Sequence, residues 1–194
     1  MKAIENYDKV EANTGEYEVL PVGGYVCKIT AAEVTTAQKS GKEMLVINFD
    51  IAEGKYKDFY KRKYEDALNR NTDISKSVKW PGVYRQMLEG DKADSYFKGL
   101  ITTLEASNPS FNWLSCNWDE SKLRGLLFGG LFGREEYQRM DGSYGFSTKL
   151  RFVRSLEKIK NGEFEIPSDK LMKKEEDPFS NNGFTPVEDD DLPF

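Results

Sequence analysis

One short stretch of the chain combines the two kinds of side chain that hold a nucleic-acid strand. Residues 56–64 read YKDFYKRKY, in which four aromatic rings are interleaved with four basic side chains. Bases stack on aromatic rings, and lysine and arginine side chains follow the phosphates. This pattern predicts a surface for single-stranded nucleic acid made by Tyr56, Phe59, Tyr60, Lys61, Arg62 and Lys63.

The same stretch also fits an ordinary amphipathic strand, with its rings in the core and its cations in solvent. Phe59 and Tyr60 are adjacent. In a strand they point to opposite faces, so at least one ring is expected outside the core. That argument favours binding and leaves the packing alternative open.

A second set of aromatic and basic residues flanks a predicted hairpin loop at residues 140–143. It comprises Arg134, Tyr137, Arg139, Tyr144, Lys149 and Arg151. Arg139 and Tyr144 fit binding and plain exposure equally well. Phe146, Leu150 and Phe152 recur with a period of two and are expected in the core.

Four further residues complete the candidate binding set. Lys39 and Lys42 lie in a predicted turn between the first two strands, and Trp80 and Tyr84 lie in the middle of the chain. Trp80 precedes a proline, so it also fits a ring that anchors its loop to the body.

The elements that must position these residues follow from hydrophobic periodicity and turn residues. Alternation predicts strands at 24–32, 45–51, 56–64, 126–138 and 144–156. Helical spacing marks 92–107, and residues 83–89 are expected as a short helix. Three strands, a helical insertion at about 65–124 and two more strands is the order of an OB-fold, a mainly β, five-stranded barrel. An α+β domain with an antiparallel sheet is the alternative.

Composition disfavours most kinds of enzyme. The 194 residues include no histidine and only two cysteines, Cys27 and Cys116. We therefore expect no catalytic residues, metal site, disulfide framework or cofactor. A nuclease would need carboxylates that converge on Mg²⁺, and pairs such as Glu65 and Asp66 fit a solvated surface better. No apolar run approaches the roughly 20 residues of a membrane span, so a cytoplasmic protein is expected.

Charge is distributed unevenly along the chain. Of 28 basic and 33 acidic residues, the segment 161–194 holds three and ten, which leaves a net charge of +2 for residues 1–160 and −7 for the segment. This asymmetry is typical of a nucleic-acid-binding body with an acidic interaction tail. The tail is expected to lack fixed structure from about residue 165, and it could compete with DNA for the body.

The last six residues carry a specific resemblance. They are Asp189, Asp190, Asp191, Leu192, Pro193 and Phe194. This run resembles the acidic tip of the single-stranded DNA-binding proteins of bacteria and their phages, which join an OB-fold to a flexible linker. The resemblance implies that the tip recruits replication, recombination and repair proteins, and that the body binds single-stranded DNA without strong sequence preference.

The body looks more like a phage-encoded relative than like the bacterial housekeeping protein. Its middle insertion is long, and its body, with LPVGGYVCKITAAEV near the start, resembles phage replication-accessory proteins. The expected organisation is an arm at 1–20, a DNA-binding domain at 21–160 and a linker with its tail at 161–194, in the host cytoplasm. No oligomeric state is carried over. The alternative function is an interaction adaptor, or an acidic inhibitor of DNA-processing proteins, that does not bind DNA itself.

Overall fold

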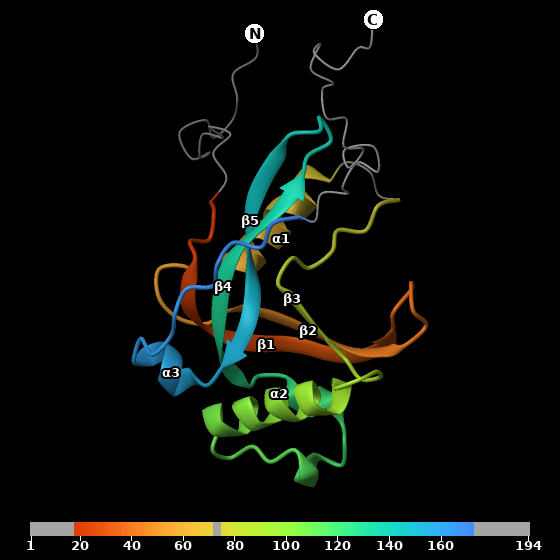
Figure 1. The fold of residues 1–194 in the computed structure, drawn as a ribbon, viewed down its shortest axis with the longest axis vertical. Helices are drawn as coiled ribbons and strands as arrows, with labels where there is room; N and C mark the ends of the chain where they lie inside the picture. The colour runs from red at the N-terminus through yellow and green to blue at the C-terminus, as the bar shows by residue number, and fades with distance from the viewer. Residues whose placement is uncertain (1–17, 72–74, 173–194) are drawn as a thin grey trace, which may run out of the picture.

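Five antiparallel strands form one sheet in the order β3-β2-β1-β4-β5. The structure, a computed structural model, describes residues 18–71 and 75–172. The strands are β1 (Gly23–Thr36), β2 (Glu43–Ile51), β3 (Val83–Met87), β4 (Leu127–Gln138) and β5 (Tyr144–Arg154). Figure 1 shows the long β4–β5 hairpin running crosswise to β1 and β2, so the sheet is strongly coiled. The predicted mainly β class is confirmed.

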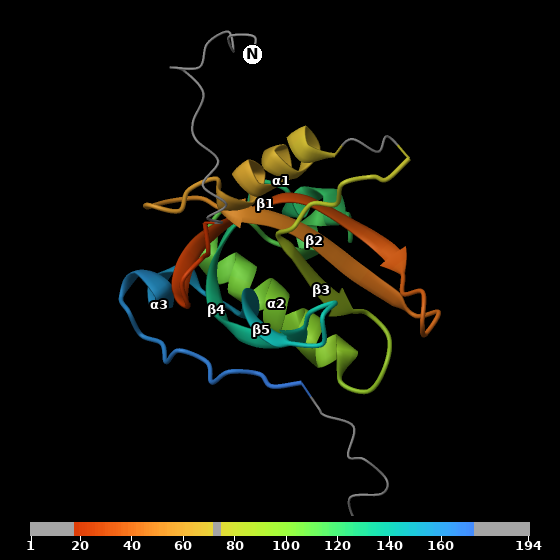
Figure 2. The same ribbon diagram turned by 90° about the horizontal axis from the view of Figure 1, so that it is seen from above.

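Helices fill two of the connections between the strands, and one more follows the last strand. The connections hold α1 (Phe59–Arg70), α2 (Ala93–Ser107) and two 3₁₀ turns, η2 (Leu114–Cys116) and η3 (Glu120–Leu123), and α3 (Leu156–Lys160) comes after β5. The prediction of a helix at 92–107 is confirmed by α2, which lies between β3 and β4. In Figure 1, α2 runs below the crossing of the strands, and Figure 2 shows the same elements from above.

β1 is the central strand because it pairs with a different neighbour at each end. Gly23–Lys28 pairs with β4, and Cys27–Thr36 pairs with β2. Register shifts interrupt the ladders between Ile29 and Ala31 and between Leu131 and Phe132. Such bulges bend a strand and increase its twist. The second one lies within the glycine-containing run of β4, between Gly130 and Gly133.

The predicted strand at 56–64 is wrong, because this stretch is a turn followed by α1. The backbone N–H groups of Tyr60 and Lys61, in the first turn of the helix, donate to the Asp50 carboxylate at 2.8 and 2.9 Å. Asp50 lies on β2 and is buried. A carboxylate satisfies the orphan donors of a helix start and complements its dipole. The capping residue therefore lies ten residues before Tyr60, outside the three or four residues in which a helix cap is normally sought.

The predicted helix at 83–89 is also wrong, because its first five residues form the edge strand β3. Phe49 donates its backbone N–H to the Gly82 carbonyl at 2.9 Å, and Met44–Asn48 then pairs with β3. Pairing satisfies the backbone groups along the outer edge of β2, which a helix would leave open. The third strand is therefore β3, and the boundaries 65–124 for one helical insertion do not hold.

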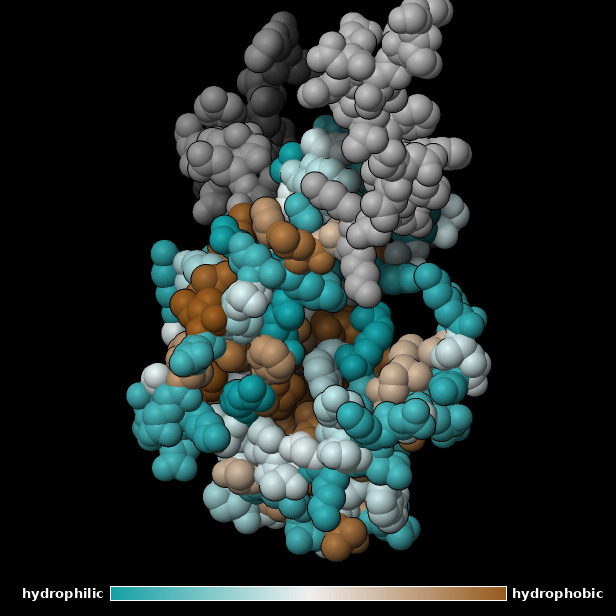
Figure 3. All heavy atoms as spheres, in the orientation of Figure 1, coloured by the Kyte–Doolittle hydropathy of each residue, from teal (hydrophilic) through white to brown (hydrophobic). Residues whose placement is uncertain are grey.

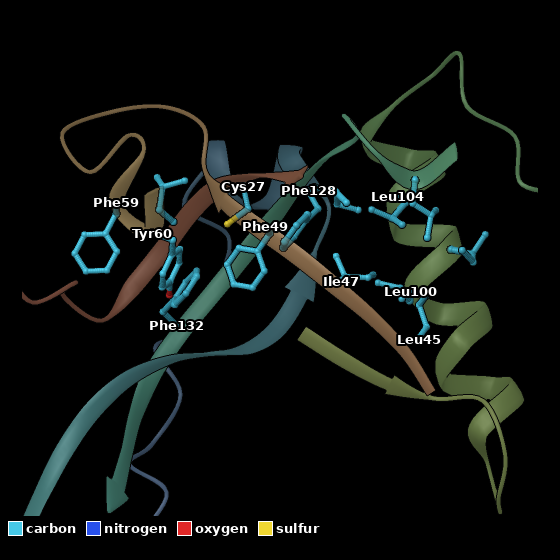
Figure 4. Packing of buried hydrophobic residues seen from close by; sticks show 14 of the residues in the cluster. Cys27, Leu45, Ile47, Phe49, Phe59, Tyr60, Leu100, Leu104, Phe128 and Phe132 are labelled. Atoms are coloured by element: carbon cyan, nitrogen blue, oxygen red, sulfur yellow. The ribbon is translucent and has the colours of Figure 1, made fainter. Parts of the chain in front are cut away.

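The core is a row of rings and aliphatic side chains that links α1 to α2 through the sheet. Phe49 is at its centre, with ring centroids 5.3 Å from Tyr60 and 5.6 Å from Phe128. Figure 4 shows the α1 residues at one end of the row and Leu100 and Leu104 of α2 at the other. One cluster of buried residues therefore contacts both helices.

The segment after α3 packs along β4 instead of leaving the body at residue 165. Lys170 forms a parallel bridge with Glu135, and its backbone N–H donates to the Arg134 carbonyl at 2.9 Å. Asp169 forms an ion pair with Arg134 at 2.7 Å. The expectation of no fixed structure from residue 165 is therefore wrong for 165–172. The acidic tip lies outside the described residues, as does most of the arm at 1–20. No helix among the described residues is long and apolar enough to cross a membrane.

Candidate nucleic-acid interface

The sheet is open between its two edge strands, β3 and β5. In the strand order they are the two ends, and α2 contacts both of them. Two grooves lie along this opening, one beside α2 and one beside α1. On the face drawn in Figure 3, apolar residues gather in the middle of the molecule with hydrophilic residues around them.

The first groove, here called the α2 groove, measures about 490 Å³ between β3, α2 and β5. Tyr84, Tyr96 and Phe152 supply its rings, and Arg151 and Arg154 supply its charges. Tyr96 is 65% exposed and Phe152 is 42% exposed, so both present ring surface to solvent. The Arg154 guanidinium lies 4.9 Å from the centroid of the Phe152 ring. None of the described residues that line this groove is acidic.

Arg151, which lines this groove, carries an unsatisfied donor. Its Nη1 atom is buried and has no hydrogen-bond partner among the residues that the structure describes. A buried guanidinium N–H without an acceptor is costly, and a phosphate oxygen is a strong acceptor for it. Arg151, which the sequence analysis proposed for binding, therefore lines the α2 groove, and its charge also acts on Glu135 on the lining of the α1 groove.

The second groove, here called the α1 groove, measures about 390 Å³ between α1 and the β4–β5 hairpin. Its lining includes Lys63, Lys149, Tyr137 and Phe146, with Glu135 as the acidic member. Lys149 lies 3.9 Å from Glu135. The hydrogen bond from Lys170, helped by the nearby charges of Lys170, Lys149 and Arg151, lowers the pKa of Glu135 below its usual range. Glu135 is therefore ionised near pH 7 and offsets part of the local positive charge.

Phe59 and Tyr60 do not offer stacking surfaces. They are 2% and 7% exposed and belong to the core, so the argument that one ring must face outward failed with the strand. Tyr56 is half-buried, with its ring centroid 5.9 Å from that of Tyr25. The aromatic side of YKDFYKRKY is packing.

The cations of the same stretch separate around α1. Lys61 lies 4.0 Å from Glu65, and Arg62 pairs with Glu18 at 2.9 Å on the exposed side. Lys63 covers the Phe59 ring at 4.8 Å and lines the α1 groove. Among the cations predicted in this stretch, only Lys63 lines the α1 groove. Residues of the β4–β5 hairpin line the same groove.

Trp80 anchors its loop. Its Nε1–H donates to the Phe49 carbonyl at 3.0 Å, and its ring centroid lies 5.4 Å from that of Tyr64. These contacts support the packing alternative for this tryptophan. Tyr84 is half-buried in the α2 groove, where its hydroxyl donates to Gln86 at 3.1 Å and burial raises its pKa.

The predicted loop residues lie at the tips of the two long hairpins. Lys39 and Lys42 are exposed between β1 and β2, and Arg139 is exposed between β4 and β5. Tyr144 and Phe146 are 44% and 45% exposed on β5. Arg134 lies over the Phe146 ring at 5.3 Å while it pairs with Asp169.

The sequence interpretation missed four groove residues that could contact a strand, Tyr96, Phe146, Phe152 and Arg154. Phe146 and Phe152 were expected in the core, but both are more than two fifths exposed. Arg154 was not proposed, although it continues the alternation of β5. Burial follows from which face of β5 the rest of the sheet covers, and β5 is an edge strand. Period two alone cannot distinguish those faces.

Comparison with known proteins gives a match to a family whose activity is not assigned, and the match covers part of the chain. A family described as "Protein of unknown function (DUF669)" matches residues 5–80, a segment that includes β1, β2 and α1. No curated protein matches the chain. Among the described residues there is no group of three or more His, Cys, Asp or Glu side chains that could hold a metal ion.

Proposed function

We propose that this protein is an OB-fold protein that binds single-stranded DNA without strong sequence preference. An OB-fold is a partly open five-stranded Greek-key barrel. In that fold the first strand lies between the second and the fourth, and the third and fifth strands approach each other. The strand order β3-β2-β1-β4-β5, with α2 between β3 and β4, supports this assignment.

The lining of the α2 groove is the observation that carries the proposal. Bases would stack on the exposed rings of Tyr96 and Phe152, and phosphates would contact Arg151 and Arg154. Every base has a π face, so stacking of this kind tolerates any sequence. Lys63, Lys149 and Phe146 extend the same chemistry into the α1 groove.

The acidic tip completes the proposed function as a docking peptide. Its aspartates would steer it to basic pockets, and Leu192 and Phe194 would provide apolar anchors. The partners would be replication, recombination or repair proteins of a phage-infected cell. This part of the proposal is based on the sequence resemblance.

Titration of a labelled oligo-dT with the full chain tests DNA binding. We expect binding that weakens steeply with salt, and we expect Phe152→Ala to reduce affinity by about tenfold through loss of a stacked base. Leu68→Ala is the matched control, because Leu68 is 46% exposed on α1 and lines neither groove. If the chain does not bind at low salt, the adaptor alternative replaces this proposal.

A further inference from the structure

A separate aromatic hollow lies on the other side of α2. It measures about 220 Å³ and is formed by α2, the loop that leads to β4, and the β1–β2 hairpin. We call it the tryptophan hollow. Its lining consists of Val34, Leu45, Leu88, Asp94, Phe97, Trp113, Trp118 and Glu120. It shares no lining residue with the α1 groove or the α2 groove.

Three rings of the hollow contact one another. Phe97 and Trp118 are stacked, with centroids 6.4 Å apart and planes 16° apart. Trp113 meets both edge-on, at 5.8 Å from Phe97 and 5.9 Å from Trp118. Aromatic walls of this kind attract cations through the negative faces of the rings.

The backbone holds Trp118 at the surface in an unusual conformation. Asn117 and Trp118 are consecutive non-glycine residues with φ of 53° and 61°. This left-handed region is costly for residues with a Cβ, and such residues cluster at binding sites. Trp118 is nevertheless 66% exposed, which is unusual for the largest apolar side chain in a hollow.

Trp113, which also lines the hollow, has an unsatisfied donor. The residue is 5% exposed, and its Nε1–H has no hydrogen-bond partner among the described residues. A buried donor of this kind is costly, and the ring that carries it forms one wall of the hollow.

The charges of the hollow select the sign of its occupant. Asp94 and Glu120 line it, and its described lining contains no lysine or arginine. A phosphate backbone would be repelled here, whereas a guanidinium can stack on indole and pair with carboxylates. We propose that the tryptophan hollow binds an arginine side chain of a partner protein.

The indole N–H signals of the three tryptophans allow a direct test with the full chain. The probe is a blocked peptide Gly-Leu-Arg-Leu-Gly, and the control peptide has uncharged citrulline in place of arginine. We expect the arginine peptide to shift the Trp113 and Trp118 signals saturably at millimolar concentration. Trp80 is the internal reference, because its N–H is already bonded to Phe49.

Matched variants distinguish recognition of the arginine cation from nonspecific hydrophobic binding. Trp118→Ala and Glu120→Gln are each expected to weaken the arginine peptide by about fivefold or more. Leu114→Ala should leave it unchanged, since Leu114 is 76% exposed nearby and does not line the hollow. Equal shifts with citrulline, or no saturable shift, would overturn the proposal. A response of the same two signals to oligo-dT would also overturn it and would make the hollow a nucleic-acid surface.

Discussion

At the scale of single residues, Arg151 links the fold to the proposed DNA site. It lines the α2 groove from β5, and its buried Nη1 has no acceptor among the described residues. An unsatisfied buried donor costs about 1–3 kcal/mol. A phosphate that accepts this N–H would remove that cost, so we expect Arg151 to contribute to the free energy of DNA binding.

Arg151→Met tests this role. We expect oligo-dT affinity to fall, and the slope of log K against log salt to become shallower by about one unit, because one phosphate contact is lost. The free energy of unfolding should stay the same or rise, since the orphan donor is removed. Arg124→Met is the control, because Arg124 is exposed outside both grooves. An unchanged salt slope would remove Arg151 from the interface.

The two cysteines report on packing at the same scale. Cys27 is fully buried on β1, and burial raises the pKa of its thiol well above the usual value. Cys116 is half-exposed in the loop after α2. The thiolate is the reactive form. At pH 8 the native protein should therefore be alkylated by iodoacetamide at Cys116 and not at Cys27, as read by mass spectrometry, and both should react in denaturant. Rapid native labelling of Cys27 would contradict the pairing of β1 with β4.

At the scale of elements, α1 depends on a carboxylate from another strand. Asp58, the residue at the helix start, has φ of 57° and makes no side-chain cap. Asp50 takes this role through its bonds to Tyr60 and Lys61. The start of α1 and the end of β2 are consequently one structural unit.

Asp50→Ala should lower the free energy of unfolding by about 2–3 kcal/mol, because it leaves helix-start N–H groups without an acceptor. Denaturant unfolding followed by circular dichroism measures this loss. Asp66→Ala is the matched control, since Asp66 is exposed and its carboxylate lies 3.9 Å from Arg70. Such exposed pairs contribute little, so the control should stay within about 0.5 kcal/mol of the wild type. Equal effects of the two changes would refute the cap.

The elements also show where sequence patterns are sufficient. The β1–β2 hairpin, α2 and the β4–β5 hairpin have strong periodicity and clear turn residues, and all of them form where the sequence predicts. The errors at 56–64 and 83–89 have one cause, which is contact between distant segments. Asp50 turns the first stretch into a helix, and the free edge of β2 turns the second into a strand. Neither effect is visible in a local window.

The candidate site was predictable to the same extent. The expectation that the β4–β5 hairpin supplies aromatic and basic residues led to Lys149, Arg151 and Tyr137, which line the grooves. Tyr96 was assigned to a helix but not to a surface, because its face of α2 depends on where β5 lies. The sequence identifies aromatic and basic residues that could bind DNA, but the fold decides which of them line a groove.

At the scale of the whole molecule, the body and the acidic segment carry opposite net charges, +2 for residues 1–160 and −7 for 161–194. Part of that segment already contacts the body, because Asp169 pairs with Arg134 and Lys170 bridges to Glu135. Asp169 and Lys170 therefore lie along β4. Strand β5, which pairs with β4, lines both grooves. If the body binds DNA as proposed, we expect the remaining acids of the segment to compete with DNA through electrostatic attraction, which salt screens over a Debye length of about 8–10 Å under physiological conditions.

Deletion of residues 185–194 removes the last four acids and should tighten oligo-dT binding several-fold at low salt, with the difference shrinking as salt rises. Replacing Leu192 and Phe194 by alanine keeps the charge, so this variant should bind DNA like the wild type while it loses partner recruitment. Titrations at two salt concentrations measure the first effect, and co-sedimentation with replication proteins of the host measures the second. If the alanine variant tightens DNA binding as much as the deletion does, the competition is not electrostatic, because only the deletion changes the charge.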